Sequence, residues 1–123
     1  MKLHADTHGS LNTVTAYGTG YVEINRQRFE GPVLVRPEGE VLPWGVAGFD
    51  ALAHEHFEAL LAHAPDVVLL GTGERQRFPH PRLTASLVQV RIGVEVMDTR
   101  AACRTYNILM SEGRRVLAAL LPL

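Results

Sequence analysis

Several features that define whole classes of protein are scarce in this sequence. Cys103 is its only cysteine, so the chain can form no internal disulfide and no cysteine-pair metal or redox motif. A disulfide-stabilised scaffold is thereby excluded, and we expect a reducing compartment, the cytoplasm. Charge of one sign is also lacking, because 12 Lys and Arg against 13 Asp and Glu give a formal net charge of −1. This balance provides no basic surface for nucleic acid, so we expect no nucleic-acid partner.

Long apolar runs are missing as well. The longest, residues 116–123, contains Pro122, whereas a membrane-spanning helix needs about 20 apolar residues. Residues 1–8 include charged and polar side chains where a signal peptide would have an apolar stretch. We therefore expect neither membrane insertion nor secretion.

The composition is that of an ordinary globular domain. Hydrophobic residues make up 46% and charged residues 20% of the 123 residues, close to the average for folded domains. A chain of this length buries about two thirds of its unfolded surface, enough for a core without metal or crosslinks. We expect one domain over residues 1–123, with a mobile segment at 1–12, a β-meander and loop at 13–49 and an α/β unit at 50–123.

Residues 13–42 contain short apolar stretches separated by turn residues. Val22 and Ile24 share one face of a predicted strand, and their neighbours share the other. The polar turn residues 25–28 separate this strand from the apolar run Val33–Val35. The pattern predicts an antiparallel β-meander.

Beyond residue 50 the apolar spacing becomes that of helices. A first amphipathic helix is predicted by the apolar residues at positions 53, 57, 60, 61 and 64. Asp50 is its candidate N-cap and Pro65 its stop. A second helix is predicted over residues 100–111, with one stripe that faces the sheet: Ala102, Tyr106 and Leu109.

Three apolar runs predict neighbouring strands in one core, each covered on both faces: residues 67–70, 94–97 and 116–121. Residues 82–92 fit both a helix and a strand. We assign them to a helix, because parallel strands need a crossover connection rather than a tight turn. The predicted fold class is therefore α/β, with an N-terminal antiparallel β-meander packed beside a small βαβαβ unit.

Three sequence blocks resemble a known family: VLLGTG at 68–73, IGVEVMDT at 92–99 and ACRTYN at 102–107. It is the family of small bacterial and archaeal proteins of unknown function to which the mitochondrial respiratory complex I assembly factor 3 belongs. The resemblance runs from about residue 21 to the C-terminus and includes the Trp44 segment. It implies a compact three-layer β plus α/β fold and no settled reaction for the bacterial members. Two departures are Arg91, where the family commonly has a small residue, and the missing mitochondrial targeting extension.

Two of these blocks end predicted strands, the position at which open parallel sheets bind ligands. Glycines let backbone N–H groups approach a ligand, and the N-terminus of the following helix favours an anion. The candidate ligand-binding residues for a small anion are Gly71, Thr72, Gly73, Asp98, Thr99, Arg104, Tyr106 and Asn107. The alternative is that these residues only turn the chain, cap the helix and satisfy buried polar groups.

The sequence offers no cofactor motif and no catalytic set. The dinucleotide fingerprint lacks its third glycine, and no phosphate-loop lysine follows Gly73. His54 and His56 are two residues apart, on opposite sides of a helix, so they cannot share a metal ion. Cys103 has no histidine placed beside it, and a buried apolar role is expected. We predict no cofactor, no metal and no catalytic residue.

Two functions remain open. The favoured one is a non-enzymatic binding or assembly module with a protein partner, in which Trp44 and Phe49, in and beside the loop at 43–48, anchor the interface. Trp44 can equally cover the junction between the meander and the α/β unit. The second function is an enzyme or sensor for a small anionic metabolite at the strand ends. We expect a monomer or a weak homo-oligomer.

Overall fold

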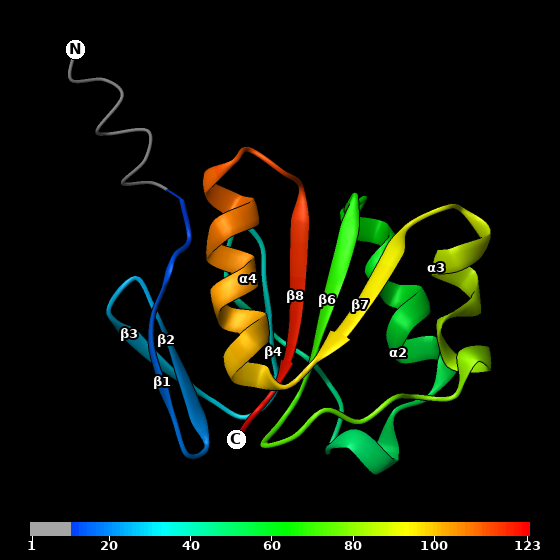
Figure 1. Ribbon diagram of the computed structural model, residues 1–123, viewed down its shortest axis with the longest axis horizontal. Helices are drawn as coiled ribbons and strands as arrows, with labels where there is room; N and C mark the ends of the chain where they lie inside the picture. The colour runs from blue at the N-terminus through cyan, green and yellow to red at the C-terminus, as the bar shows by residue number, and fades with distance from the viewer. Residues whose placement is uncertain (1–10) are drawn as a thin grey trace.

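Two β-sheets organise the computed structural model, which describes residues 11–123 (Figure 1). The strands of the larger sheet are, in spatial order, β5 (Leu42–Pro43), β4 (Val33–Val35), β8 (Val116–Leu121), β6 (Val67–Thr72) and β7 (Gly93–Met97). β8, β6 and β7 are parallel, β4 is antiparallel to β8, and β5 is antiparallel to β4. The predicted α/β fold class is confirmed.

The smaller sheet is an antiparallel meander, as predicted, but its third strand was missed, because Gln27 and Arg28, expected in a turn, begin that strand. Its strands are β1 (Val14–Gly18), β2 (Tyr21–Ile24) and β3 (Gln27–Glu30), each antiparallel to the next. Val22 and Ile24 are buried, as their alternation predicts. β4 and β5, which the sequence pattern grouped with the meander, instead extend the larger sheet, because the fully buried β4 pairs with β8.

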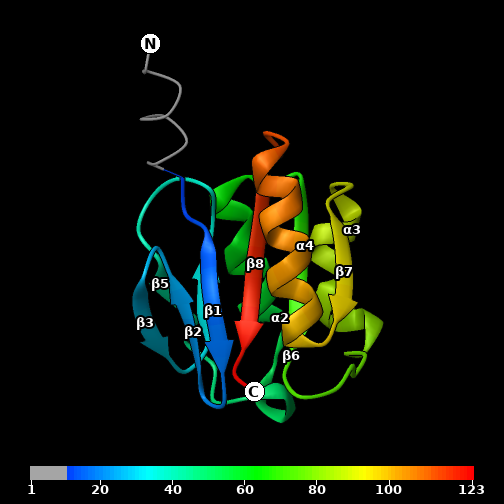
Figure 2. The same ribbon diagram turned by 60° about the vertical axis from the view of Figure 1, so that its left-hand side comes forward.

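The larger sheet is covered on both faces. The small sheet and helix α4 (Thr99–Ser111) pack on one face; α2 (His54–Glu58), the 3₁₀ helix η2 (Ala59–His63) and α3 (Ala85–Gln89) pack on the other (Figures 1 and 2). Each face of the larger sheet has its own hydrophobic core. In β6, Val67 and Leu69 belong to the core beneath the small sheet and α4, and Val68 and Leu70 belong to the core beneath α2, η2 and α3. Two-sided burial explains why residues 67–70 of β6 are all apolar. The three layers implied by the family resemblance are present.

One strand differs from the prediction of two-sided burial. β7 is the last strand of the larger sheet, and the burial of its residues alternates: Glu95 is exposed, whereas Val94 and Val96 are partly buried. The two valines pack on the side of α2 and α3. The prediction that residues 94–97 are covered on both faces is therefore wrong at Glu95, which is exposed at the edge of the sheet, whereas Met97 at the end of the strand is partly buried against the core on the α4 side.

The helical predictions hold with local corrections. Residues 81–89 are helical, as the 3₁₀ helix η3 (Pro81–Thr84) followed by α3. Arg91 then adopts a left-handed φ of 65° before β7, a conformation that favours glycine. Asp50 is not the N-cap of the first helix, because α2 begins only at His54. Asp50 lies instead in the 3₁₀ helix η1 (Phe49–Ala51), and its carboxylate pairs with Arg77.

The buried stripe of α4 also differs from the prediction. The helix buries Ala102, Cys103, Tyr106 and Met110 and leaves Leu109 only partly covered. The i, i+4, i+8 line through Ala102, Tyr106 and Met110 faces the sheet, so Leu109 lies to one side of it. Truncation of Leu109 to alanine should therefore cost less than the loss of about 2–5 kcal/mol expected for a fully buried leucine.

The predicted mobile segment at 1–12 lies almost entirely outside the described residues. At its end Asn12 is buried, and its side-chain amide donates to the carbonyls of Arg36 and Gly39 at 2.8 and 2.7 Å. In the part of the chain that the structure describes, no helix has both the length and the apolar character needed to cross a membrane.

Candidate functional site

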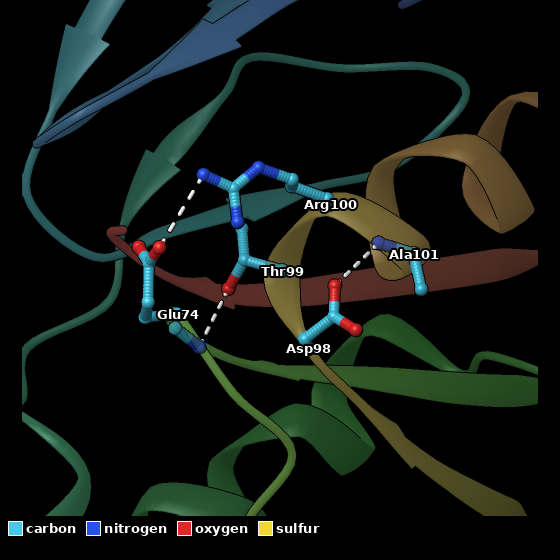
Figure 3. Close-up of polar contacts among 6 residues, drawn as sticks. Glu74, Asp98, Thr99, Arg100 and Ala101 are labelled. Atoms are coloured by element: carbon cyan, nitrogen blue, oxygen red, sulfur yellow. Dashed lines mark hydrogen bonds and ion pairs between the residues drawn. The ribbon is translucent and has the colours of Figure 1, made fainter.

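Thr99 joins the ends of three elements at the predicted ligand site (Figure 3). The Thr99 side chain is fully buried; its hydroxyl accepts the Gly73 N–H at 2.8 Å and donates to the Leu121 carbonyl at 2.6 Å. The backbone N–H of Thr99 donates to the Gly73 carbonyl at 2.9 Å. These contacts connect the first turn of α4 to the chain that follows β6 and to the last residue of β8.

Gly71 lets α4 approach the sheet closely. A Cβ at this position would come within 3.0 Å of Leu120 Cδ2 and of Thr99 Oγ1, and within 3.2 Å of Ala102 Cβ. Gly73 has a left-handed φ of 97°, so it turns the chain away from β6. Both glycines therefore have a structural use at the junction of β6 and α4.

Asp98 and Thr72 are also used by the fold. Asp98 is the N-cap of α4, and its Oδ1 accepts the Ala101 N–H at 2.9 Å (Figure 3), the usual role of an aspartate there. The buried Thr72 hydroxyl donates to the Arg75 carbonyl at 2.7 Å and accepts the Arg77 N–H at 3.1 Å. It holds the turn after β6 in place.

The other three predicted ligand residues lie further along α4 and face the small sheet. The Asn107 amide accepts the Val14 N–H and donates to the Val14 carbonyl, both at 2.9 Å, so it pairs with the backbone of β1. The buried Tyr106 hydroxyl donates to the Asn12 carbonyl at 2.8 Å. The exposed Arg104 donates to the Tyr17 hydroxyl at 3.1 Å.

The eight predicted ligand residues thus form two groups rather than one. Gly71, Thr72, Gly73, Asp98 and Thr99 meet at the strand ends, as the sequence blocks indicated. Arg104, Tyr106 and Asn107 lie further along α4 toward the small sheet, and Asn107 is about 12 Å from Thr99 at the helical rise of 1.5 Å per residue. The polar atoms described above are bonded within the chain, so an anion at the strand ends would have to displace existing hydrogen bonds.

The two aromatic residues of the predicted interface have different surroundings. Trp44 is only 5% exposed, its ring lies 5.8 Å from that of Phe57 in an edge-to-face arrangement, and its indole N–H donates to the His56 carbonyl at 3.4 Å. Phe49 is partly buried under the Arg77 guanidinium, which lies 4.0 Å from the ring centroid. Trp44 is a core residue here, whereas Phe49 lies close to the surface.

Cys103 is buried in the core beneath α4. Burial raises the pKa of its thiol to about 12, against a smaller opposing effect of the Arg104 charge. A thiol with this pKa is fully protonated at neutral pH and is a poor nucleophile. Among residues 11–123, no group of three or more His, Cys, Asp and Glu side chains is placed to hold a metal ion.

We expect Cys103 to make the folded state sensitive to alkaline pH. The unfolded thiol ionises near its ordinary pKa of 9.0, whereas the folded thiol keeps its proton until about pH 12. The stability that Cys103 contributes is therefore complete below pH 9 and is lost as the pH rises from 9 to 12. The melting temperature between pH 7 and 11 should fall less steeply for Cys103→Ala than for the natural chain. Parallel curves for the two proteins would contradict the raised pKa.

A surface feature that the sequence analysis missed lies beside β7. Phe78 and Val88 are 71% and 60% exposed. They line a cavity of about 440 Å³, which we call the β7 groove and whose apolar walls include Phe78, Pro79, Val88, Ile92, Val94 and Val96. A single phenylalanine in a polar loop carries no periodic signal, so only the structure identifies this surface.

The chain is similar to proteins of one family over most of its length. The family model described as protein of unknown function DUF498/DUF598 matches residues 14–121. NADH dehydrogenase [ubiquinone] 1 alpha subcomplex assembly factor 3 of Bos taurus is 33% identical over 111 residues, 89% of this chain and 60% of that protein. An uncharacterized Rhodobacter capsulatus protein is 37% identical over 110 residues, 89% of this chain and 84% of its own. The chain spans about 60% of the length of the assembly factor.

Solved structures agree with the fold. The crystal structure of a Bordetella parapertussis protein is 48% identical with a TM-score of 0.86, and the match covers 93% of this chain and 98% of that one. The NMR structure of a Bordetella pertussis protein, described as a Mth938-like domain, is 42% identical with a TM-score of 0.81 and covers 99% and 92%. The family resemblance seen in the sequence blocks is therefore confirmed, and the chain belongs to the DUF498/DUF598 family of proteins of unknown function.

Proposed function

We propose that the chain is a non-catalytic module that binds a protein partner, and that the partner lays an extended apolar segment along the β7 groove. The observation that carries the proposal is the exposure of Phe78 and Val88 at the wall of this groove. Large exposed apolar side chains that gather at a concave surface are typical of interaction sites.

The position of the groove beside a sheet edge favours an extended partner. β7 is the last strand of the larger sheet, and β6 is its neighbour on the other side. An edge strand accepts an added strand through its backbone, while side-chain pockets beside it give specificity. The exposed Gln76 side chain already donates to the Val96 carbonyl of β7 at 2.9 Å. A partner strand would either displace this side chain or bind beside it.

Charge near the groove favours acidic residues in the partner. Arg91 lines the groove and Arg82 lies on the adjacent η3, and neither takes part in an ion pair within residues 11–123. Glu95 on β7 is the opposing charge. An apolar segment with acidic flanks fits this surface, because complementary charges speed encounter and disfavour other partners.

Two further features support a binding role. The named eukaryotic relatives are assembly factors of NADH dehydrogenase, which is a role carried out on other proteins. Phe49, one of the two aromatics expected at the interface, is connected to the groove region through Arg77, which stacks on its ring and directly precedes Phe78. We place Phe49 at the margin of the proposed surface and leave Trp44 in the core.

Site-specific photo-crosslinking tests this proposal. A photoreactive amino acid replaces Val88 in one variant and Ile108 in the other, because Ile108 is equally exposed, at 58%, but lies on α4. Irradiation in the native cells is expected to give a defined protein adduct at position 88 and none of the same identity at position 108. The partner identified in this way should bind the purified Phe78→Ser variant at least tenfold more weakly, a loss of about 1.4 kcal/mol, and bind Ile108→Ser unchanged.

The same experiment has clear contrary outcomes. Equal adducts at positions 88 and 108, or no adduct at 88, would remove the groove as the binding surface. An adduct only with a second copy of the chain would make it a homodimer interface instead. Because Phe78 and Ile108 are both exposed, the two serine variants should melt within a few degrees of the natural chain.

A further inference from the structure

A second cavity lies at the opposite end of the parallel strands from the predicted ligand site. It has a volume of about 340 Å³ and lies where β4 ends and where β6 and β8 begin, beside the last turn of α4. We call it the arginine cavity, after four basic residues in its wall: Arg36, His63, Arg114 and Arg115. It shares no lining residue with the β7 groove.

The charge in this cavity is unbalanced toward positive. Glu38 is the only acidic residue among those that line it. Arg115 is already paired with Asp66 at 3.2 Å, but neither Arg36 nor Arg114 belongs to any ion pair among residues 11–123. Two guanidinium groups without a carboxylate partner in one cavity favour the entry of an anion.

Arg36 shows the clearest sign of a missing acceptor. Its Nη2 donates to the Glu40 carbonyl at 3.2 Å, whereas its Nε is buried and has no hydrogen-bond partner among the described residues. A buried donor without a partner costs about 1–3 kcal/mol, and more when it is charged. A small shift of the Arg36 side chain that brought this nitrogen to a ligand oxygen would remove that cost, and the planar guanidinium is suited to carboxylates and phosphates.

The rest of the wall is apolar. Leu11, Pro65, Met110 and Leu117 line the cavity together with the basic residues. Its volume lies within the range of about 300–1,000 Å³ that small-molecule sites occupy. A ligand with one anionic group and a compact apolar body would therefore find both kinds of surface.

We propose that the arginine cavity binds a small organic anion whose carboxylate or phosphate group contacts Arg36 and Arg114 and whose apolar body packs on Met110 and Leu117. The site goes beyond the proposed partner binding, because it uses a different surface. Burial and the Arg36 charge lower the pKa of His63, which favours its neutral form and leaves the binding charge to the arginines.

Titration of the isotope-labelled chain with four probes tests the proposal. Benzoate and phenyl phosphate carry the two anionic groups on one apolar body, benzyl alcohol is their neutral counterpart, and inorganic phosphate lacks the apolar body. We expect an organic anion to shift the backbone amide signals of Arg36, Met110 and Gly113. Benzyl alcohol and inorganic phosphate should each bind at least tenfold more weakly, which corresponds to about 1.4 kcal/mol. The comparison of benzoate with phenyl phosphate distinguishes the two head groups.

Three variants assign the effect to the cavity. Arg36→Gln and Arg114→Gln should each weaken binding of the preferred anion at least tenfold, about 1.4 kcal/mol. Arg75→Gln, at an exposed arginine outside the cavity, should leave binding unchanged. If Arg36→Gln lowers the melting temperature, the test depends on Arg114→Gln alone, because Arg114 is exposed and its replacement should not affect folding. No shift with either organic anion at about 10 mM, equal binding of benzyl alcohol, or an equal loss in Arg75→Gln would overturn the proposal, whatever the outcome at the β7 groove.

Discussion

Trp44→Ala is expected to lower the free energy of unfolding by about 3–5 kcal/mol, the cost of removing a large aromatic side chain from a core. Trp44 is 5% exposed and packs edge-to-face on the fully buried Phe57, with 5.8 Å between ring centroids. Whole domains are stable by only about 5–15 kcal/mol, so the variant should be close to unfolding at physiological temperature. Urea titration followed by circular dichroism measures the loss, because the variant has no tryptophan for fluorescence.

Phe49→Ala is the matched control. Its ring is partly buried under the Arg77 guanidinium rather than enclosed in the core, so its removal should cost clearly less than that of Trp44. A loss below about 1 kcal/mol for Trp44→Ala would mean that the ring contributes little to the core and would return it to the list of interface anchors. Under the expected result, loss of partner binding by Trp44→Ala reports unfolding and says nothing of an interface.

The two central strands could be predicted from the sequence because their signal is local. Residues 67–70 and 116–121 are apolar at every position, which only a strand between two covered faces requires. The helical assignment of residues 82–92 depended on a further constraint, the need for a crossover between parallel strands. Where local pattern and chain connectivity agree, the prediction was correct.

The position of a strand within the sheet could not be predicted in the same way. Residues 94–97 are apolar apart from Glu95, and that single polar residue is what marks β7 as half-exposed. β4 was assigned to the meander because it is close to it in sequence, although its hydrogen bonds go to β8, some 80 residues further along the chain. Strand order depends on such long-range pairings, and periodicity does not encode them.

The candidate sites show the same difference between local signals, which the sequence reveals, and long-range contacts, which it does not. Sequence blocks correctly indicated that Gly71–Gly73 and Asp98–Thr99 are close in space, because both follow parallel strands. They did not reveal that the polar groups bond to one another. The arginine cavity was missed altogether, since Arg36, His63 and Arg114 come from segments far apart in the sequence that only the folded sheet brings together.

Thr99→Val is expected to lower the free energy of unfolding by about 2–6 kcal/mol, although valine has nearly the same shape. The hydroxyl accepts from the Gly73 N–H and donates to the Leu121 carbonyl, and its loss leaves both groups buried without a partner. Each unsatisfied group costs about 1–3 kcal/mol. The effect should appear as a lower urea midpoint with an unchanged slope, because the surface exposed on unfolding stays the same.

Thr99→Ser separates the hydroxyl from the methyl group. Serine keeps the donor and the acceptor and loses one buried methyl, at a cost of about 1 kcal/mol, so most of the stability should return. This result would establish that Thr99 joins β6, α4 and β8, which is the structural alternative to a ligand role at the strand ends. If Thr99→Val instead kept the stability of the natural chain, the hydroxyl would not be needed by the fold. It would then be free to bind a ligand, and the anion site predicted at Gly71–Gly73 and Asp98–Thr99 would regain its support.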